Sequence, residues 1–306
     1  MIALSLPDAL MSLFLRTVVK PVLSPRFPLR VQRAWLELTS LLNLLPPGVR
    51  RSRTTLGGVP TVVLAPRGVA LDGAPDRPVV LYLHGGAFVL GSPRTHQALA
   101  GWLAKAVGGP VHLIEYRLAP EHPYPAGRED ALAAYRALLD LGVPPSRIVV
   151  AGDSAGGGLT IATLLALRDR ALPRPAGGVC VSPWVDLTNS APSHASRAAV
   201  DPIVMREGLA MMADAYVGTG DRKQPLVSPL YADLRDLPPL LVQVGSDEVL
   251  LDDAVGLGAR ARAAGVDVVV EEWPAMIHVW HWFLPMLDEA QRAIDGIGTF
   301  VRARLH

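Results

Sequence analysis

Val-Ala-Gly-Asp-Ser-Ala-Gly-Gly-Gly, residues 150–158, is the stretch that decides the fold. It follows an apolar run at 148–151 and precedes a helix-favouring run at 159–165. Strand, sharp turn and helix in this order predict a turn that presents its central residue, Ser154, outward. The glycines on either side let strand and helix approach without a Cβ clash. Small-residue turns are common, so the rest of the chain must decide whether Ser154 is reactive or an ordinary turn serine.

Apolar runs alternate with helical patterns around this turn. Runs typical of strands buried on both faces lie at 61–64, 79–83, 111–116, 147–150, 179–181, 240–244 and 266–271. Helical patterns lie at 95–107, 129–141, 155–170, 252–264 and 286–304. This alternation predicts an α/β fold with a mostly parallel central sheet flanked by helices. The first two strands are candidates for antiparallel pairing.

Two segments do not fit the alternation. Residues 7–45 hold two helix-like stretches, one with Leu10 and Phe14 on its apolar face, and prolines break them. Residues 187–225 are rich in proline and methionine, and read as an insertion after the strand at 179–181.

Composition excludes several classes of protein. The 306 residues are 50% hydrophobic, which predicts a folded globule with a sizeable core. A formal net charge of +1 gives no electrostatic argument for a nucleic-acid partner or an anionic membrane. The only cysteine, Cys180, lies in a predicted buried strand, which argues against a disulfide framework and a reactive thiol. No leader or membrane-spanning pattern stands out, so we expect no stable membrane insertion and a cytoplasmic location.

Chemistry-bearing residues follow four of the predicted strands. These strand-end segments are 84–88 (His-Gly-Gly-Ala-Phe), the Ser154 turn, 245–248 (Gly-Ser-Asp-Glu) and 276–280 (Met-Ile-His-Val-Trp). Sites of open α/β sheets gather at the carboxyl ends of strands. Consecutive glycines free backbone amides to bind a negative oxygen. Serine, aspartate and histidine in this chain order are the arrangement of an α/β-hydrolase triad.

The sequence resembles the bacterial branch of the hormone-sensitive lipase family, often called family IV. Four segments carry the resemblance: residues 84–88, residues 116–126, Gly152 to Gly156, and residues 247–252 together with 276–278. It implies the α/β-hydrolase fold with a helical cap. The chain departs from the family pattern at Ala87 and Val279, where glycine is commoner.

The resemblance implies a serine ester hydrolase that needs no metal or cofactor. Ser154 would attack the ester carbonyl, His278 would carry the proton, and Asp247 would orient the imidazole. Backbone amides of Gly85, Gly86 and Ala155 would bind the oxyanion. These positions are the expected catalytic and oxyanion-hole residues.

Several other residues compete for these roles. His281 is a second candidate base, but His278 matches the family motif. Asp252 and Asp253 fall in the following helix, which favours Asp247 as the acid. Glu248 is left open between a supporting carboxylate and a solvated turn residue. The remaining polar candidates are expected to organise loops rather than touch substrate: His84, Arg117, Glu121 and Asp186.

The two irregular segments resemble the family's cap. We expect residues 1–48 to form its N-terminal part and residues 187–225 its second part, within a catalytic domain of residues 49–306. Candidate pocket residues are Phe88, Trp184, Met205, Met211 and Trp280, and the alternative for each is ordinary packing. The expected partner is a small acyl ester of short to medium chain length.

Three alternatives stay open. The same triad could hydrolyse amides or remove acetyl groups, and a catalytically silent ligand-binding protein could use the same scaffold. The strand at 266–271 is expected to be the last of the sheet, where an exposed edge can pair with a second copy into a homodimer.

Overall fold

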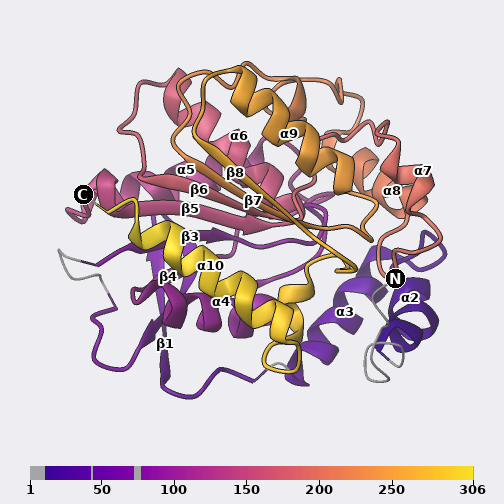
Figure 1. Ribbon diagram of the computed structural model, residues 1–306, viewed down its shortest axis with the longest axis horizontal. Helices are drawn as coiled ribbons and strands as arrows, with labels where there is room; N and C mark the ends of the chain where they lie inside the picture. The colour runs from indigo at the N-terminus through magenta and orange to yellow at the C-terminus, as the bar shows by residue number, and fades with distance from the viewer. Residues whose placement is uncertain (1–10, 43, 72–76, 306) are drawn as a thin grey trace.

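The computed structural model describes residues 11–42, 44–71 and 77–305, and they form an eight-stranded sheet covered by helices (Figure 1). The strands are β1 (Val49–Leu56), β2 (Val59–Pro66), β3 (Val79–Leu83), β4 (Val111–Ile114), β5 (Ile148–Asp153), β6 (Gly177–Val181), β7 (Leu240–Gly245) and β8 (Val268–Trp273). Their order across the sheet is β1-β2-β4-β3-β5-β6-β7-β8.

The sheet is mostly parallel, as the sequence predicts. Strands β3 to β8 pair in parallel, whereas β2 runs antiparallel to both β1 and β4. The expectation of antiparallel pairing is therefore right for the strand at 61–64 and wrong for the strand at 79–83. The antiparallel hairpin partner β1 has no counterpart among the predicted strands.

Helices cover both faces of the sheet. On one face lie α4 (Pro93–Val107) and α10 (Asp288–Arg302), which pack against each other. On the other lie α5 (Ala126–Asp140), α6 (Ala155–Asp169) and α9 (Leu251–Ala263). Short 3-10 turns at Pro145–Arg147, Pro229–Tyr231 and Trp280–Phe283 join these elements. The helices begin and end within a few residues of the predicted patterns.

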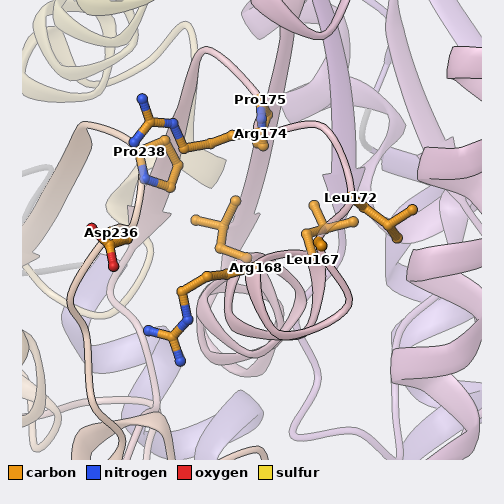
Figure 2. Close-up of a pocket in the computed structure, with 9 residues that line it drawn as sticks. Leu167, Arg168, Leu172, Arg174, Pro175, Asp236 and Pro238 are labelled. Atoms are coloured by element: carbon orange, nitrogen blue, oxygen red, sulfur yellow. The ribbon is translucent and has the colours of Figure 1, made fainter.

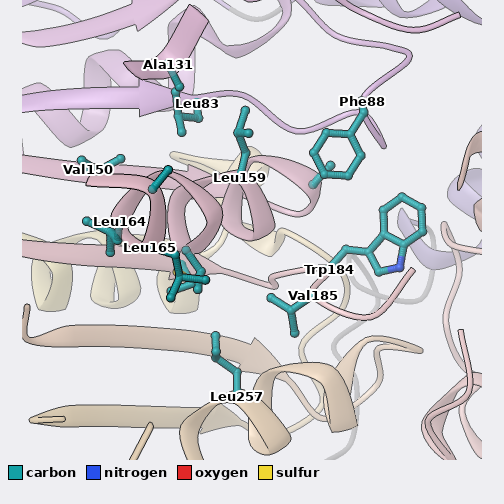
Figure 3. Packing of buried hydrophobic residues seen from close by; sticks show 14 of the residues in the cluster. Leu83, Phe88, Ala131, Val150, Leu159, Leu164, Leu165, Trp184, Val185 and Leu257 are labelled. Atoms are coloured by element: carbon teal, nitrogen blue, oxygen red, sulfur yellow. The ribbon is translucent and has the colours of Figure 1, made fainter. Parts of the chain in front are cut away.

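The core is divided between the two faces because strand side chains alternate. Leu81, Leu83 and Val150 point to the α6 side, whereas Val80 and Val149 point to the α4 side. Figure 3 shows the α6 side, where leucines of α6 meet Leu83 and Val150 from the sheet and Leu257 from α9. This packing fixes β5 and α6, and with them the turn that carries Ser154.

The two irregular segments lie together at one end of the sheet, where α2, α3, α7 and α8 are grouped (Figure 1). The first segment holds a π-helical turn (Leu15–Val19), α2 (Lys20–Val22), α3 (Leu29–Thr39) and a 3-10 turn (Ser40–Leu42). The second holds α7 (Ser193–Ser196) and α8 (Arg206–Val217). Arg16 joins them, because its guanidinium donates to the carbonyl oxygens of Ala199 and Val200. Leu10 lies outside the described residues.

Candidate active site

Ser154 lies in a sharp turn between β5 and α6, with φ 54° and ψ −122°. Glycine is required on both sides of it. A Cβ on Gly156 would lie 2.0 Å from the carbonyl oxygen of Leu83, and one on Gly152 would lie 2.4 Å from that of Gly156. The turn brings strand and helix into backbone contact, and leaves Ser154 only 8% exposed at the end of the sheet.

His278 completes a hydrogen-bonded chain with Ser154. Its Nε2 lies 3.0 Å from Ser154 Oγ, and its Nδ1 lies 2.9 Å from Oε2 of Glu248. Ser154 follows β5, Glu248 follows β7 and His278 follows β8, so three strand ends on one half of the sheet supply the three side chains, with β6 lying between β5 and β7. A hydroxyl, an imidazole and a carboxylate in this order form the arrangement that activates a serine.

The expectation that Asp247 orients the histidine is wrong in this structure. The carboxylate of Asp247 is partly exposed and accepts a hydrogen bond from Ser246 Oγ at 3.1 Å, whereas Glu248 is fully buried beside His278. Consecutive residues in the turn after β7 place their side chains differently, and the turn directs position 248 toward the imidazole.

Two donors hold the other oxygen of Glu248. Ser182 Oγ and the Gly245 amide each donate to Oε1 at 2.7 Å, which leaves Oε2 for His278. Ser182 Oγ in turn accepts from the amide of Val279, next to the histidine, at 3.2 Å. Ser182 is not among the site residues that the sequence predicts, and its place directly after β6 is the one signal that could have identified it.

The environment of His278 raises its pKa above the ordinary value. Burial opposes this, because it disfavours the charged imidazolium. The hydrogen bond and negative charge of Glu248, with the carboxylates of Asp201 and Asp153, outweigh the burial. The site is therefore built to stabilise a proton on His278.

The expected oxyanion donors need one correction. The Gly85 amide donates to Asp153 Oδ1 at 3.1 Å, so it is occupied in holding the loop against the β5 turn. Gly86 and Ala87 follow with φ of 114° and 51°. Within the described residues, the amides of Gly86, Ala87 and Ala155 donate to no protein acceptor. These three amides are the remaining candidates beside Ser154.

His84 holds this loop, as expected. Its Nδ1 donates to the Gly85 carbonyl oxygen at 2.8 Å, and its ring stacks on Tyr116 at 4.3 Å. Burial lowers the pKa of His84 to about 3, and the neighbouring His96 adds to the effect. The ring is therefore neutral at neutral pH and serves as a fixed donor.

Competing residues have other partners. His281 Nε2 donates to Gln243 Oε1 at 2.9 Å, and burial lowers the pKa of His281 to about 3. Asp252 accepts from the Ser193 amide, and Asp253 accepts from the amides of Val185 and Asp186. The preference for His278 over His281, and the exclusion of the two aspartates, are consistent with this geometry.

The loop-organising residues behave as expected. Arg117 pairs with Asp130 at 2.7 Å, and Glu121 pairs with Arg33 of α3 at 2.8 Å. Asp186 accepts from Thr188 Oγ1 and Ser190 Oγ within its own loop. Cys180 is buried, and burial raises the pKa of its thiol.

The predicted pocket residues are mostly packed. Trp184 and Trp280 are fully buried, so the structure gives them no part in an open pocket. Phe88 stacks on Tyr216 of α8 at 4.0 Å, and Met211 packs against the core of the α6 face. Met205 lines a cavity of about 300 Å³ between the two irregular segments, together with Lys20 and His194.

A further cavity of about 290 Å³ lies at the C-terminal end of α6, remote from Ser154 (Figure 2). Leucines, prolines, Arg168 and Arg174 line it, and Arg168 donates to the carbonyl oxygens of Asp233 and Arg235. Neither cavity includes a residue of the Ser154–His278–Glu248 chain.

Comparison with known proteins places the chain in a family. A profile of the α/β-hydrolase fold matches residues 80–282. The crystal structure of an esterase from the bacterial hormone-sensitive lipase family has 44% identity and a TM-score of 0.91, and the alignment covers 97% of this chain and 98% of that one. The chain belongs to the bacterial hormone-sensitive lipase family. This is a family of carboxylic ester hydrolases, and the chain has its fold over nearly its whole length.

Named relatives of the family include hydrolases of several kinds. An acetyl-hydrolase from Streptomyces hygroscopicus is 51% identical over 74% of this chain and 76% of its own length. The carboxylesterase/phospholipase LipF from Mycobacterium tuberculosis is 33% identical over 97% of this chain and 82% of its own. The crystal structure of the family member EstE5, soaked with p-nitrophenyl butyrate, has 42% identity and a TM-score of 0.91, covering 97% and 98% of the chains.

Proposed function

We propose that this protein is a serine carboxylesterase that hydrolyses short- to medium-chain acyl esters through Ser154, His278 and Glu248. The hydrogen-bonded chain from Ser154 Oγ to His278 Nε2, and from His278 Nδ1 to Glu248, is the observation that carries the proposal. Family membership supports it independently.

The proposed reaction has two halves. In the first, His278 takes the proton of Ser154 Oγ while the oxygen attacks the ester carbonyl, and then gives that proton to the leaving alcohol. In the second, His278 takes a proton from water, the hydroxide attacks the acyl-serine, and the proton returns to Ser154. Glu248 fixes the imidazole tautomer and stabilises the imidazolium in both halves.

The developing oxyanion needs amide donors beside Ser154. We assign this role to the amides of Gly86, Ala87 and Ala155. Gly85 leaves the expected set because its amide donates to Asp153. Preorganised donors of this kind each contribute on the order of 10²–10³ in rate. His84 and Asp153 act behind them and hold the loop in place.

The helical segments are proposed to form a cap that limits the acyl chain. Phe88, two positions beyond Gly86, stacks on Tyr216 of α8, and both residues are 3% exposed. Tyr216 also accepts the Tyr124 amide through its carbonyl oxygen at 2.9 Å. An aromatic pair thus fills the space between the loop and α8, which favours a short acyl group.

Rates on p-nitrophenyl acetate, butyrate, octanoate and palmitate test the chain-length proposal. We expect kcat/KM to be highest for acetate or butyrate and to fall by at least about tenfold at palmitate, because each misplaced methylene group meets packed side chains. A rate that rises steadily to palmitate, or to long-chain triglycerides, would contradict the proposed cap.

Three variants test the triad. Ser154→Ala should lower kcat by about 10³- to 10⁶-fold. Glu248→Gln should lower it by about 10²- to 10⁴-fold. Asp247→Asn is the matched control, and should retain nearly all activity because Asp247 contacts Ser246 rather than His278. Loss of activity in Asp247→Asn with a fully active Glu248→Gln variant would restore the sequence-based assignment.

Removal of acetyl groups from amides or alcohols is the second candidate function. The relative named acetyl-hydrolase, at 51% identity, favours it as a specific case of the same chemistry. Comparison of p-nitrophenyl acetate with p-nitroacetanilide separates ester from amide cleavage. We expect the ester to be preferred. The same triad acts on both substrates, but the amine of the amide must be protonated before it can leave.

A further inference from the structure

The residue after Glu248 is held by side chains of the 187–225 insertion. Asp201 Oδ2 accepts a hydrogen bond from the Val249 amide at 3.0 Å. Ser193 Oγ donates to the Val249 carbonyl oxygen at 2.6 Å. Both backbone polar groups of Val249 are therefore bonded to the insertion, and the bond from its amide to Asp201 holds the peptide unit that links Val249 to Glu248.

Asp201 is built rigidly into this position. Its side chain is fully buried, and its second oxygen accepts from the amides of Ile203 and Val204 at 2.9 and 2.8 Å. Three backbone amides thus converge on one carboxylate, which is the arrangement that stabilises a buried negative charge. An acceptor with both oxygens occupied holds Val249 in a single orientation.

Two side chains of the N-terminal segment bind the backbone of residues 198–201. Arg16 donates to the carbonyl oxygens of Ala199 and Val200, and Lys20 Nζ donates to those of Ala198 and Asp201. Four successive carbonyl groups, those of residues 198–201, are bonded to two cationic side chains. We call Arg16 and Lys20 the clamp. Its last contact is with Asp201, the residue whose carboxylate binds the Val249 amide.

We propose that Asp201 is a positioning residue of the active site, and that it transmits the docking of the N-terminal helices to Glu248. It acts through the Val249 amide and keeps Glu248 Oε2 at its hydrogen-bonding distance from His278. The proposal deepens the proposed function and rests on it. The helical segments accordingly do more than cover the substrate, because they complete the support of the triad carboxylate.

Loss of Asp201 should also change the titration of His278. The charged groups that act on the His278 ring are Glu248, Asp201 and Asp153, and all three favour the imidazolium. A displaced Glu248 and a missing charge at position 201 both disfavour it. The two effects have the same sign, so a loss of Asp201 should move the acidic limb of the pH–rate profile to lower pH.

The test compares Asp201→Asn with a matched control, Asp214→Asn, which removes an exposed carboxylate of α8 that pairs with Arg222. Active sites are counted by burst titration with a p-nitrophenyl phosphonate, and kcat/KM on p-nitrophenyl butyrate is measured from pH 4.5 to 9. We expect Asp201→Asn to lose about 10- to 100-fold in kcat/KM per titrated site, with the acidic limb moved to lower pH. Asp214→Asn should match the wild type in both.

A second variant decides the matter if Asp201→Asn does not fold. The double variant Arg16→Ala/Lys20→Ala leaves the carboxylate in place and removes its clamp. We expect it to lose about 3- to 10-fold per titrated site, with the limb moved in the same direction. A purely structural role would lower the number of titratable sites and leave the rate per site and the pH profile unchanged.

The inference is overturned if Asp201→Asn keeps the wild-type rate per titrated site and the wild-type pH profile. If Asp201→Asn does not fold, the same result in the double variant overturns it. If Ser154→Ala is inactive in the same assay, the proposed function stands even where the inference about Asp201 fails. Full activity of Ser154→Ala would instead overturn the function itself.

Discussion

At the scale of the residue, the site depends on which of two adjacent carboxylates turns toward His278. Asp247 and Glu248 follow the same strand, carry the same charge and differ by one methylene group. Ser182 Oγ and the Gly245 amide select Glu248, because they bind one of its oxygens and direct the other to the imidazole. Both donors come from strand ends, so the choice is made by the sheet rather than by the side chain.

The raised pKa of His278 leads to a prediction about pH dependence. Only the neutral imidazole can accept the serine proton, so kcat/KM should rise with pH through the pKa of His278 in the free enzyme. Because burial is outweighed by Glu248 and the neighbouring carboxylates, the midpoint should lie above the ordinary value of about 6.5. In Glu248→Gln the hydrogen bond to a charged partner is lost, and the midpoint should move to lower pH.

Profiles of kcat/KM on p-nitrophenyl butyrate, recorded from pH 4.5 to 9 for the wild type, Glu248→Gln and Asp247→Asn, test this. The Asp247→Asn profile should overlie that of the wild type. A wild-type midpoint well below 6, or a shift in Asp247→Asn alone, would contradict the assignment of the carboxylate.

At the scale of the element, the loop after β3 and the turn after β5 are joined by one carboxylate. Asp153 Oδ1 accepts from Tyr82 Oη at 2.8 Å and from the Gly85 amide at 3.1 Å, and Oδ2 lies 3.3 Å from His96 Nε2. Burial opposes ionisation of this group, but His96 and Tyr82 lower its pKa overall. Asp153 therefore remains charged and fixes the loop that carries the proposed oxyanion donors.

Asp153→Asn should lower kcat by about 10- to 100-fold with a smaller change in KM, because misplaced amides weaken transition-state stabilisation. Tyr82→Phe is the control, since it removes one hydrogen bond to Asp153 without touching the Gly85 amide. It should cost about 1 kcal/mol in the free energy of unfolding and little in kcat. Equal losses of kcat in the two variants would contradict a specific role for the bond between Asp153 and the Gly85 amide.

The sequence predicts the buried strands and the glycine-bounded turn because burial on both faces imposes continuous apolar runs. It does not predict β1, whose Arg-Arg-Ser-Arg-Thr-Thr stretch is mostly exposed and joins the sheet by pairing with β2. The fully buried Trp184 and Trp280 show a similar limit. An aromatic side chain near a strand end has the same sequence signature whether it lines a pocket or fills the core.

The sequence also fails to predict that Glu248 is the carboxylate beside His278 and that the Gly85 amide is already bonded, and both failures have one cause. Both depend on side chains from distant parts of the chain, Ser182 in one case and Asp153 in the other. Motif spacing carries the order of the strand ends and the kind of residue on each. It carries no information on which amide or carboxylate is already bonded when the strands assemble.

At the scale of the whole molecule, the sheet ends in two different edges. The β1 edge carries arginines and threonines, whereas β8, among the described strands, pairs only with β7 and presents Val269, which is 41% exposed. Strand 266–271 was expected to be the last of the sheet, and β8 at Val268–Trp273 is its edge strand. Within the described residues, no helix is long and apolar enough to cross a membrane.

The free β8 edge leads to the last prediction, a homodimer formed by pairing of β8 with its copy. Unpaired backbone groups beside an exposed apolar side chain favour such pairing, and edge lysines oppose it. Light scattering after size-exclusion chromatography should give twice the chain mass of 32.6 kDa for the wild type, and a single chain mass for Val269→Lys. Val255→Lys is a closely matched control, because Val255 is 40% exposed but lies on α9. It should remain dimeric, since its charge lies off the edge. A monomeric wild type, or a Val269→Lys variant that keeps the dimer mass, would rule out this edge as the interface.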